Sequence, residues 1–284
     1  ELYGVSLQQF LLKKMGRSWD DLPHDRASLD CIDRNAIDYF LKSSANRNRL
    51  QALPDNADTL TVLNNLHLVT DDGKLKFAAL LLFSKEPLLY FPAVQFKIGR
   101  FGHNSSELLF DDIIEGNILE MTDKVIRILE SKYLTSPIHY DGIYRVEQLE
   151  IPEAALREMI CNAIVHKDYQ SVPIQLKVFN DRIELWNPGV LPDGFSVETL
   201  FAEHHSHARN RNIAHVFYRA GLIEAWGRGI EKICIELANS SLQPPKFEEK
   251  QGGICVIVTR KIEPSTAQVP PKYRPSTAQV DALM

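Results

Sequence analysis

The residues best suited to chemistry come from one stretch of the chain, residues 156–169. Glu158 and Asn162 are four residues apart, and His166 follows at the same interval. Because residues i and i+4 lie on one face of an α-helix, these side chains would form a single polar line. A carboxylate and a carboxamide supply the oxygen ligands that Mg²⁺ prefers. A solvated helix face has the same spacing, so the stretch alone leaves both interpretations open.

An amphipathic helix is predicted to carry this polar line. Apolar residues recur through the stretch at intervals of three and four, which is the helical pattern. They are Leu156, Met159, Ile160, Ala163 and Ile164. Pro152 stands in front of them, where the first turn of a helix tolerates proline.

Two strands are predicted to follow, at residues 173–179 and 182–186. In the first strand, apolar residues alternate with Gln175 and Lys177, which is the pattern of a half-buried strand. The second strand runs into a turn that contains Gly189.

A second glycine segment opens another predicted helix. Gly227 and Gly229 stand at its start, and the helix would run through Leu237. Glycines at this position allow backbone N–H groups to approach a phosphate, which the helix dipole also favours. Residues 253–260 then predict a hydrophobic strand that would close the sheet.

Four segments in this order resemble the GHKL, or Bergerat-fold, ATP-binding domain. They are REMICNAIVHKDY, DRIELWNPGVLP, ARNRNIAHVF and GLIEAWGRGIEKI. They look most like the divergent GHKL domain of prokaryotic transcriptional regulators and RecG-like proteins. In that family an AlbA- or Schlafen-type domain usually lies upstream, and a winged-helix domain often lies downstream. Four motifs in the right order are far more specific than one glycine pattern.

The resemblance implies a role for each matched residue. Asn162 would hold the Mg²⁺ that bridges the ATP phosphates, and Glu158 would be the catalytic carboxylate that activates water. The family's D-x-G-x-G box is replaced here by Asn187-Pro188-Gly189. The Asn187 side-chain oxygen can still accept from the adenine amino group, but without a carboxylate's charge. The remaining cofactor-binding residues would be His166, Gly189, Ser206, Arg209, Asn210, Gly227 and Gly229.

Residues 193–226 are predicted to be the least regular part of this domain, and by resemblance they correspond to the ATP lid. Arg209 lies there, and an arginine can hold phosphate oxygens with two donors at once. A metal site is the alternative for four histidines, but no nearby cysteines or paired carboxylates accompany them. These histidines are His204, His205, His207 and His215.

Composition narrows the protein class. The 284 residues are 44% hydrophobic and 24% charged, as expected of about two ordinary globular domains. Membrane spans, leader peptides, disulfide scaffolds and zinc ribbons are not indicated, so we expect a cytoplasmic protein with no membrane partner. The four cysteines are far apart, and the missing initiator Met suggests a fragment. A net charge of −5 argues against strong DNA binding by residues 1–284 themselves.

The first half of the chain shows element patterns but no chemistry. Helices are predicted within residues 1–50 and at 57–66, with a turn at 70–73, strands at 74–83 and 94–98, and a long helix at 108–132. The apolar run at 77–83 taken alone fits either a buried strand or a short helix. Residues 57–83 could be taken for a winged helix, but they lack a basic cluster.

The predicted fold class is α+β, in three parts. A helix-rich α/β domain of unknown chemistry covers residues 1–145, a GHKL-like α/β sandwich covers residues 146–262, and a Pro/Ser/Thr-rich linker covers residues 263–284. The function expected from the resemblance is a transcriptional regulator that senses or weakly hydrolyses Mg-ATP and modulates DNA binding by flanking domains. The alternative is a non-catalytic dimerisation scaffold with a degenerate site. A P-loop helicase motor is not expected in residues 1–284, because they contain no G-x-x-x-x-G-K-[ST] loop.

Overall fold

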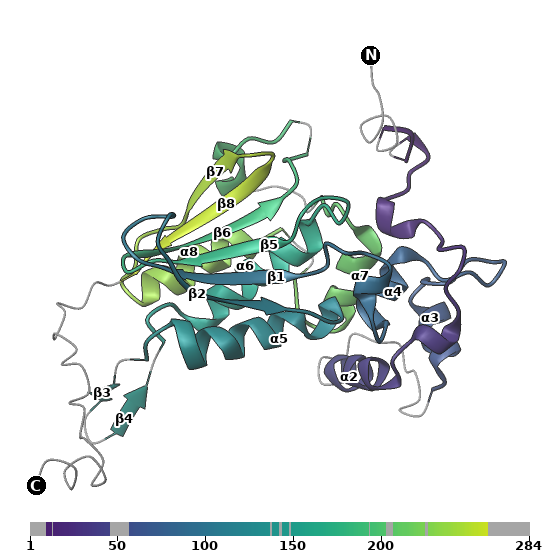
Figure 1. The fold of residues 1–284 in the computed structure, drawn as a ribbon, viewed down its shortest axis with the longest axis horizontal. Coiled ribbons are helices and arrows are strands. Elements are labelled where there is room, and N and C mark those ends of the chain that lie inside the picture. The colour runs from purple at the N-terminus through teal and green to yellow at the C-terminus, as the bar shows by residue number, and fades with distance from the viewer. Residues whose placement is uncertain are drawn as a thin grey trace, which may run out of the picture.

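The protein has an α+β fold built on a six-stranded mixed sheet (Figure 1). The predicted fold class is therefore confirmed. The computed structural model describes residues 10–12, 14–45, 57–136, 138–141, 144–147, 149–192, 194–202, 207–224 and 227–260. The predicted linker, residues 263–284, lies outside these ranges. No helix in the described ranges is long and apolar enough to cross a membrane.

The strands of the sheet run in the order β2-β1-β5-β6-β8-β7. Their bounds are β1 Phe96–Phe101, β2 Leu108–Ile114, β5 Ile174–Val178, β6 Arg182–Pro188, β7 Lys246–Lys250 and β8 Gly253–Thr259. β1 and β5 pair in parallel, and the other neighbours pair antiparallel. Strands β3 (Ile138–Asp141) and β4 (Tyr144–Glu147) form a separate antiparallel pair. Since β1 and β2 precede residue 146, both sides of the predicted domain boundary contribute to one sheet; that boundary stays a prediction.

Three helices cover one face of the sheet: α5 (Ile118–Ile128), α6 (Glu153–His166) and α8 (Gly229–Asn239) (Figure 1). α6 lies between α5 and α8, so most of its residues are buried whatever their direction. β5 shows the predicted alternation of buried and exposed side chains. Ile174, Leu176 and Val178 are buried, while Gln175 and Lys177 are partly exposed. The predicted strands at 173–179, 182–186 and 253–260 are therefore confirmed.

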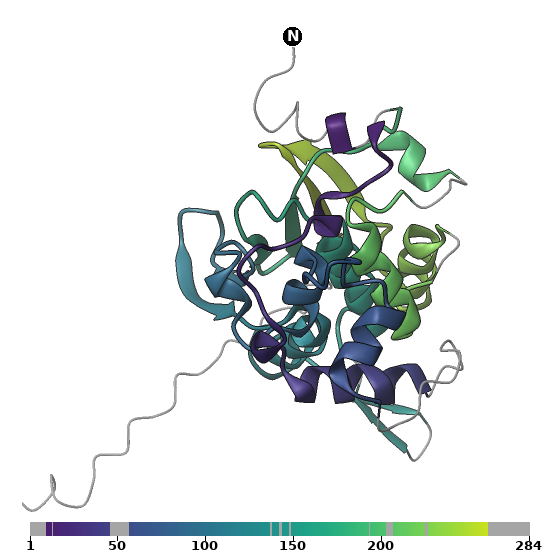
Figure 2. The ribbon, with the colours of Figure 1, turned by 90° about the vertical axis from the view of Figure 1, so that its right-hand side faces the viewer.

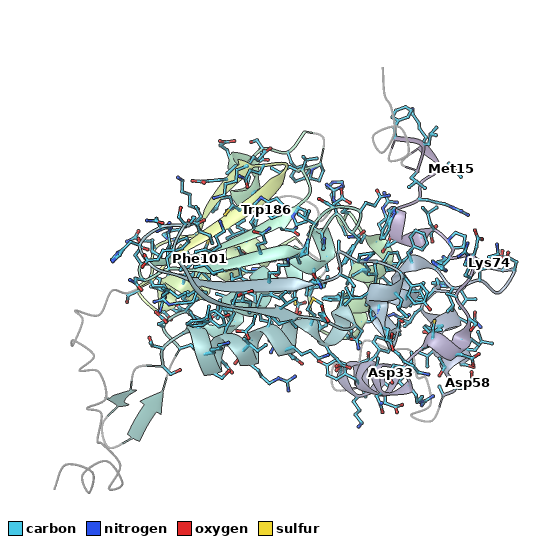
Figure 3. All side chains as sticks on the ribbon, viewed as in Figure 1. Met15, Asp33, Asp58, Lys74, Phe101 and Trp186 are labelled. Atoms are coloured by element: carbon cyan, nitrogen blue, oxygen red, sulfur yellow. The ribbon has the colours of Figure 1, made fainter. Side chains whose placement is uncertain are left out.

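Shorter helices pack beside the sheet, at the end that Figure 3 marks with Asp33, Asp58 and Lys74; Phe101 and Trp186 mark the sheet itself. They are α2 (Arg34–Ala45), α3 (Thr59–Asn65), α4 (Phe77–Phe83) and α7 (Arg211–Arg219), with the 3-10 turns η1 (Trp19–Asp21), η2 (Leu29–Cys31) and η3 (Pro87–Leu89). α2 and α3 confirm two predicted helices. The predicted turn at 70–73 is present, closed by a hydrogen bond from Gly73 N to Thr70 O.

The strand predicted at residues 74–83 is wrong and the alternative of a short helix at 77–83 is correct, because Phe77–Phe83 is the helix α4. Every residue from Ala78 to Phe83 is buried and apolar. The segment therefore shows no polar–apolar periodicity that would distinguish a helix from a strand. Its alanines and leucines favour a helix over a strand.

The long helix predicted at 108–132 is wrong over its first third, where β2 forms the edge of the sheet. Asn117 separates the two elements. Its side chain accepts a hydrogen bond from Glu120 N at 3.0 Å and so begins α5. The helix ends in the π-helical turn η4 (Leu129–Tyr133).

The region predicted to be the least regular part of its domain, residues 193–226, also contains the helix α7. Ile213, Val216 and Phe217 are buried and fix this helix against the core. Apart from the short 3-10 turn η5 (Glu198–Phe201), no helix or strand forms in the described residues between 189 and 210.

A buried ion pair closes the core near the start of α6. Arg260 donates to both carboxylate oxygens of Glu150, at 2.7 and 2.8 Å, and also to the backbone oxygen of Phe179. The side chains of Arg260 and Glu150 are 7% and 5% exposed. The end of β8 is thereby joined to the segment that leads into α6.

Candidate functional site

The predicted site residues meet in a single cavity of about 600 Å³. It lies between α6, the end of β6, the segment after it and the start of α8. The predicted cofactor-binding and catalytic residues that the structure describes all line it: Glu158, Asn162, His166, Asn187, Gly189, Arg209, Asn210, Gly227 and Gly229. Ser206 lies outside the described residues.

Glu158 and Asn162 are joined by a hydrogen bond on α6. Asn162 Nδ2 donates to Glu158 Oε1 at 3.2 Å, which leaves Asn162 Oδ1 as the oxygen suited to a metal ion. Glu158 is only 5% exposed, which argues against the alternative of a solvated helix face. Burial raises the pKa of Glu158, although Lys232 Nζ lies 3.7 Å from its other oxygen and opposes the shift.

Gly229, the first residue of α8, lies directly against this pair. A Cβ atom at this position would overlap Glu158 Oε1 and lie 3.0 Å from Asn162 Nδ2. Gly227 has a φ of +69°, a conformation that glycine adopts without strain. The two glycines therefore bring the N-terminus of α8, with its unpaired N–H groups, beside the Glu158–Asn162 pair.

Asn187, at the end of β6, holds an unsatisfied acceptor. Its Oδ1 is buried and has no hydrogen-bond partner in the described part of the chain. Such an atom costs about 1–3 kcal/mol unless a ligand or water donates to it. Gly189, two residues on, has a φ of +128° and turns the chain away from the strand.

Two residues of the predicted lid, Arg209 and Asn210, donate hydrogen bonds to backbone oxygens. Arg209 donates to Val190 O at 2.7 Å, which still leaves other N–H groups of the guanidinium. Asn210 is 1% exposed, and its Nδ2 donates to Val165 O at 2.9 Å and Lys167 O at 2.8 Å. Asn210 thus caps the end of α6, and a direct contact of its amide with a ligand stays a prediction.

The histidines do not form a metal cluster among the residues that the structure describes. The His207 ring lies edge-on to Phe195, with 5.4 Å between centroids. His215 Nε2 accepts from Arg219 at 3.3 Å, and burial lowers the pKa of His215. His204 and His205 lie outside the described residues.

Sequence reasoning missed several cavity residues. Lys167 is 1% exposed, donates to Val172 O at 2.6 Å, and has its pKa lowered to about 8 by burial. Arg17, Ser18 and Trp19 also line the cavity. No local pattern could have found these three, because the contact is made by the tertiary fold.

The class of domain is indicated by a family model. Residues 172–258 match the family described as "Putative ATP-dependent DNA helicase recG C-terminal". The match runs from β5 to β8 and includes Asn187, Gly189, Gly227 and Gly229, so this part of the chain is similar to a RecG-like, ATPase-type domain. Glu158 and Asn162 precede the match, and the fold brings them to it.

One solved structure with the same fold is the crystal structure of the DIP2311 protein from Corynebacterium diphtheriae. The two share 20% sequence identity with a TM-score of 0.68, over 88% of this chain and 49% of that chain. The chain thus spans about half the length of that protein. No match was found among the curated proteins.

Proposed function

We propose that this chain binds Mg-ATP in a GHKL-type site and belongs to a transcriptional regulator in which the nucleotide modulates DNA binding by flanking domains. The proposal is carried by the buried Oδ1 of Asn187, which has no hydrogen-bond partner among the described residues and shares a cavity with the Glu158–Asn162 pair. An acceptor at one end and a metal-ligating pair at the other suit a ligand with an amino group and a polyphosphate.

Different residues of the chain would contact the adenine, the phosphates and the Mg²⁺. Asn187 Oδ1 would accept from the adenine amino group, and the N–H groups at the start of α8 would receive phosphate oxygens. Asn162 Oδ1 would hold Mg²⁺, whose charge would neutralise the phosphates. Glu158 would orient and deprotonate a water molecule for hydrolysis. Burial raises the pKa of Glu158, which makes its carboxylate a stronger base, and Lys232 opposes this shift.

A scaffold that dimerises without a ligand is the second candidate. It is favoured by Asn210, whose amide is already bonded to two backbone carbonyls, and by the neutral Asn187 in place of an acidic residue. In that case the fold would still form the cavity, but the cavity would bind no nucleotide.

Thermal melting and calorimetric titration of residues 1–284 with Mg-ATP separate the two candidates. A ligand at about 100 times its dissociation constant should raise the free energy of unfolding by about 2.7 kcal/mol. Mg²⁺ alone and Mg-GTP serve as controls, since Asn187 Oδ1 would face the guanine carbonyl instead of an amino group. If Mg-ATP gives neither a shift in melting temperature nor a heat of binding, the ligand-free scaffold is the remaining candidate.

Duplex DNA is expected to bind this chain only weakly. Phosphate contacts dominate DNA affinity, and residues 1–284 carry a net charge of −5. Dissociation constants should be no tighter than about 10⁻⁴ to 10⁻⁶ M at physiological salt. Fluorescence anisotropy with labelled duplex over a salt series measures this. Nanomolar, sequence-selective binding would contradict the prediction and direct attention to residues 57–83.

A further inference from the structure

The N-terminal segment forms part of the wall of the cavity. Figure 2 shows this purple segment running across the face of the molecule toward the blue helices. Its residues Arg17, Ser18 and Trp19 line the same cavity as Glu158 and Asn187. None of them lies in the part of the chain that matches the ATPase-type family.

The segment docks on the first turn of α7. Asp20 is fully buried and accepts from Ile213 N at 2.9 Å, as a capping carboxylate would. Beside it, Asn212 Nδ2 donates to Asp21 Oδ1 at 3.3 Å, and Arg211 donates to Gly16 O at 3.1 Å. Three successive residues of α7 therefore hold residues 16–21.

The segment is also fixed to the helical end of the molecule. The Trp19 ring packs on Phe77 and Phe91, with centroids 4.9 and 5.4 Å away, and is nearly parallel to Tyr169 at 6.1 Å. Lys76 and Asp21 form an ion pair at 2.7 Å. Residues 16–21 thus bridge the N-terminal helices and the cavity.

This docking carries an electrostatic cost. Burial raises the pKa of Asp20 to about 6, although Ser18 and the first turn of α7 donate hydrogen bonds to the carboxylate. Near pH 7 the docked segment therefore keeps a charged carboxylate out of water, which is unfavourable. A ligand that contacts the docked segment would offset that cost.

Arg17 is suited to make this contact. Its ion pair with Asp21 is long, at 3.5 Å, and the Arg17 side chain is 52% exposed. Arg209 and Arg211 line the same cavity, so three arginines border the space that a ligand with several negative charges would occupy.

We propose that residues 16–21 form a strap over the nucleotide site, that Arg17 binds the anionic part of the nucleotide, and that nucleotide binding and docking of the strap on α7 stabilise each other. The inference rests on the proposed function. By linkage, the factor by which docking strengthens nucleotide binding is also the factor by which the nucleotide strengthens docking.

The test compares residues 1–284 with the variants Arg17→Met, Asp20→Ala and Asp25→Ala, using Mg²⁺ and the non-hydrolysable analogue AMP-PNP. Asp25 is the matched control, because it is an exposed carboxylate paired with Lys74 and does not line the cavity. Calorimetry gives the dissociation constants, and the rate of tryptic cleavage after Arg17 reports strap opening in the wild type, Asp20→Ala and Asp25→Ala.

Arg17→Met and Asp20→Ala should each raise the dissociation constant about 5-fold or more, the lower end of usual coupling factors, while Asp25→Ala leaves it unchanged. Saturating AMP-PNP should slow cleavage after Arg17 by a similar factor in the wild type. Arg17→Met keeps the test decisive if Asp20→Ala does not fold, since Arg17 is largely exposed.

The two proposals fail in different ways. Unchanged affinity in Arg17→Met, together with unchanged cleavage in wild type with AMP-PNP, overturns the strap and leaves the nucleotide site intact. No binding of AMP-PNP by the wild type overturns the proposed function, and the strap with it.

Discussion

Replacement of Asn162 by alanine is expected to abolish Mg²⁺-dependent ATP binding while the protein stays folded. The change removes the amide oxygen that would bind the metal, and one hydrogen bond to Glu158, worth about 0.5–1.5 kcal/mol. Calorimetry should therefore show no binding heat with Mg-ATP, and circular dichroism an unchanged fold with a melting temperature a few degrees lower.

A suitable control for this variant is Asn64→Ala. Asn64 is an exposed asparagine on α3, outside the cavity, so its replacement should leave ATP binding unchanged. Equal ATP-induced stabilisation of Asn162→Ala and wild type would show that Asn162 is not the metal ligand. The Mg²⁺ site would then have to be sought elsewhere in the cavity.

Gly229→Ala is the second variant with a large expected effect. Its new Cβ would overlap Glu158 Oε1 and crowd Asn162 Nδ2, so the pair must move away from its present geometry. We expect ATP affinity to fall by about 10-fold or more, equivalent to about 1.4 kcal/mol. The empty protein should lose little stability, because alanine is a better helix former than glycine by about 1 kcal/mol.

Gly102→Ala is the control that tests whether the effect depends on the position at which a glycine is replaced. A Cβ at Gly102 would likewise overlap a glutamate side chain, that of Glu107, but on the loop between β1 and β2. Titration and melting of both variants should show loss of ATP binding in Gly229→Ala alone. If Gly229→Ala instead unfolds without ligand, the glycine is structural and no longer supports a phosphate site.

The site could be predicted from the sequence where a motif coincided with a regular element. Glu158 and Asn162 lie on a helix with clear periodicity, and Gly229 begins another, so their elements were predicted correctly. Asn187 lies near the end of a strand with plain alternation. In each case the residue's position in its element fixes where the residue must lie.

Other features depend on long-range packing and left no local signal. The burial of α4 on all sides removed the periodicity that distinguishes a helix from a strand. α7 is ordered by the burial of Ile213 and Phe217 and by a carboxylate, Asp20, from the far end of the chain. Arg17 reaches the cavity because this contact and its neighbours hold residues 16–21 in place.

The Glu150–Arg260 pair also determines how mechanical load would enter the domain. Tension on the chain beyond Arg260 would meet a buried ion pair before it could peel β8 from β6 one hydrogen bond at a time. Separating these charges would cost about 3–5 kcal/mol, because Glu150 would be left buried and uncompensated. Below that threshold the force would pass to Glu150, and through the next residues to the first turn of α6. A pull on the end of β8 would thus be transmitted to the helix that carries Glu158 and Asn162.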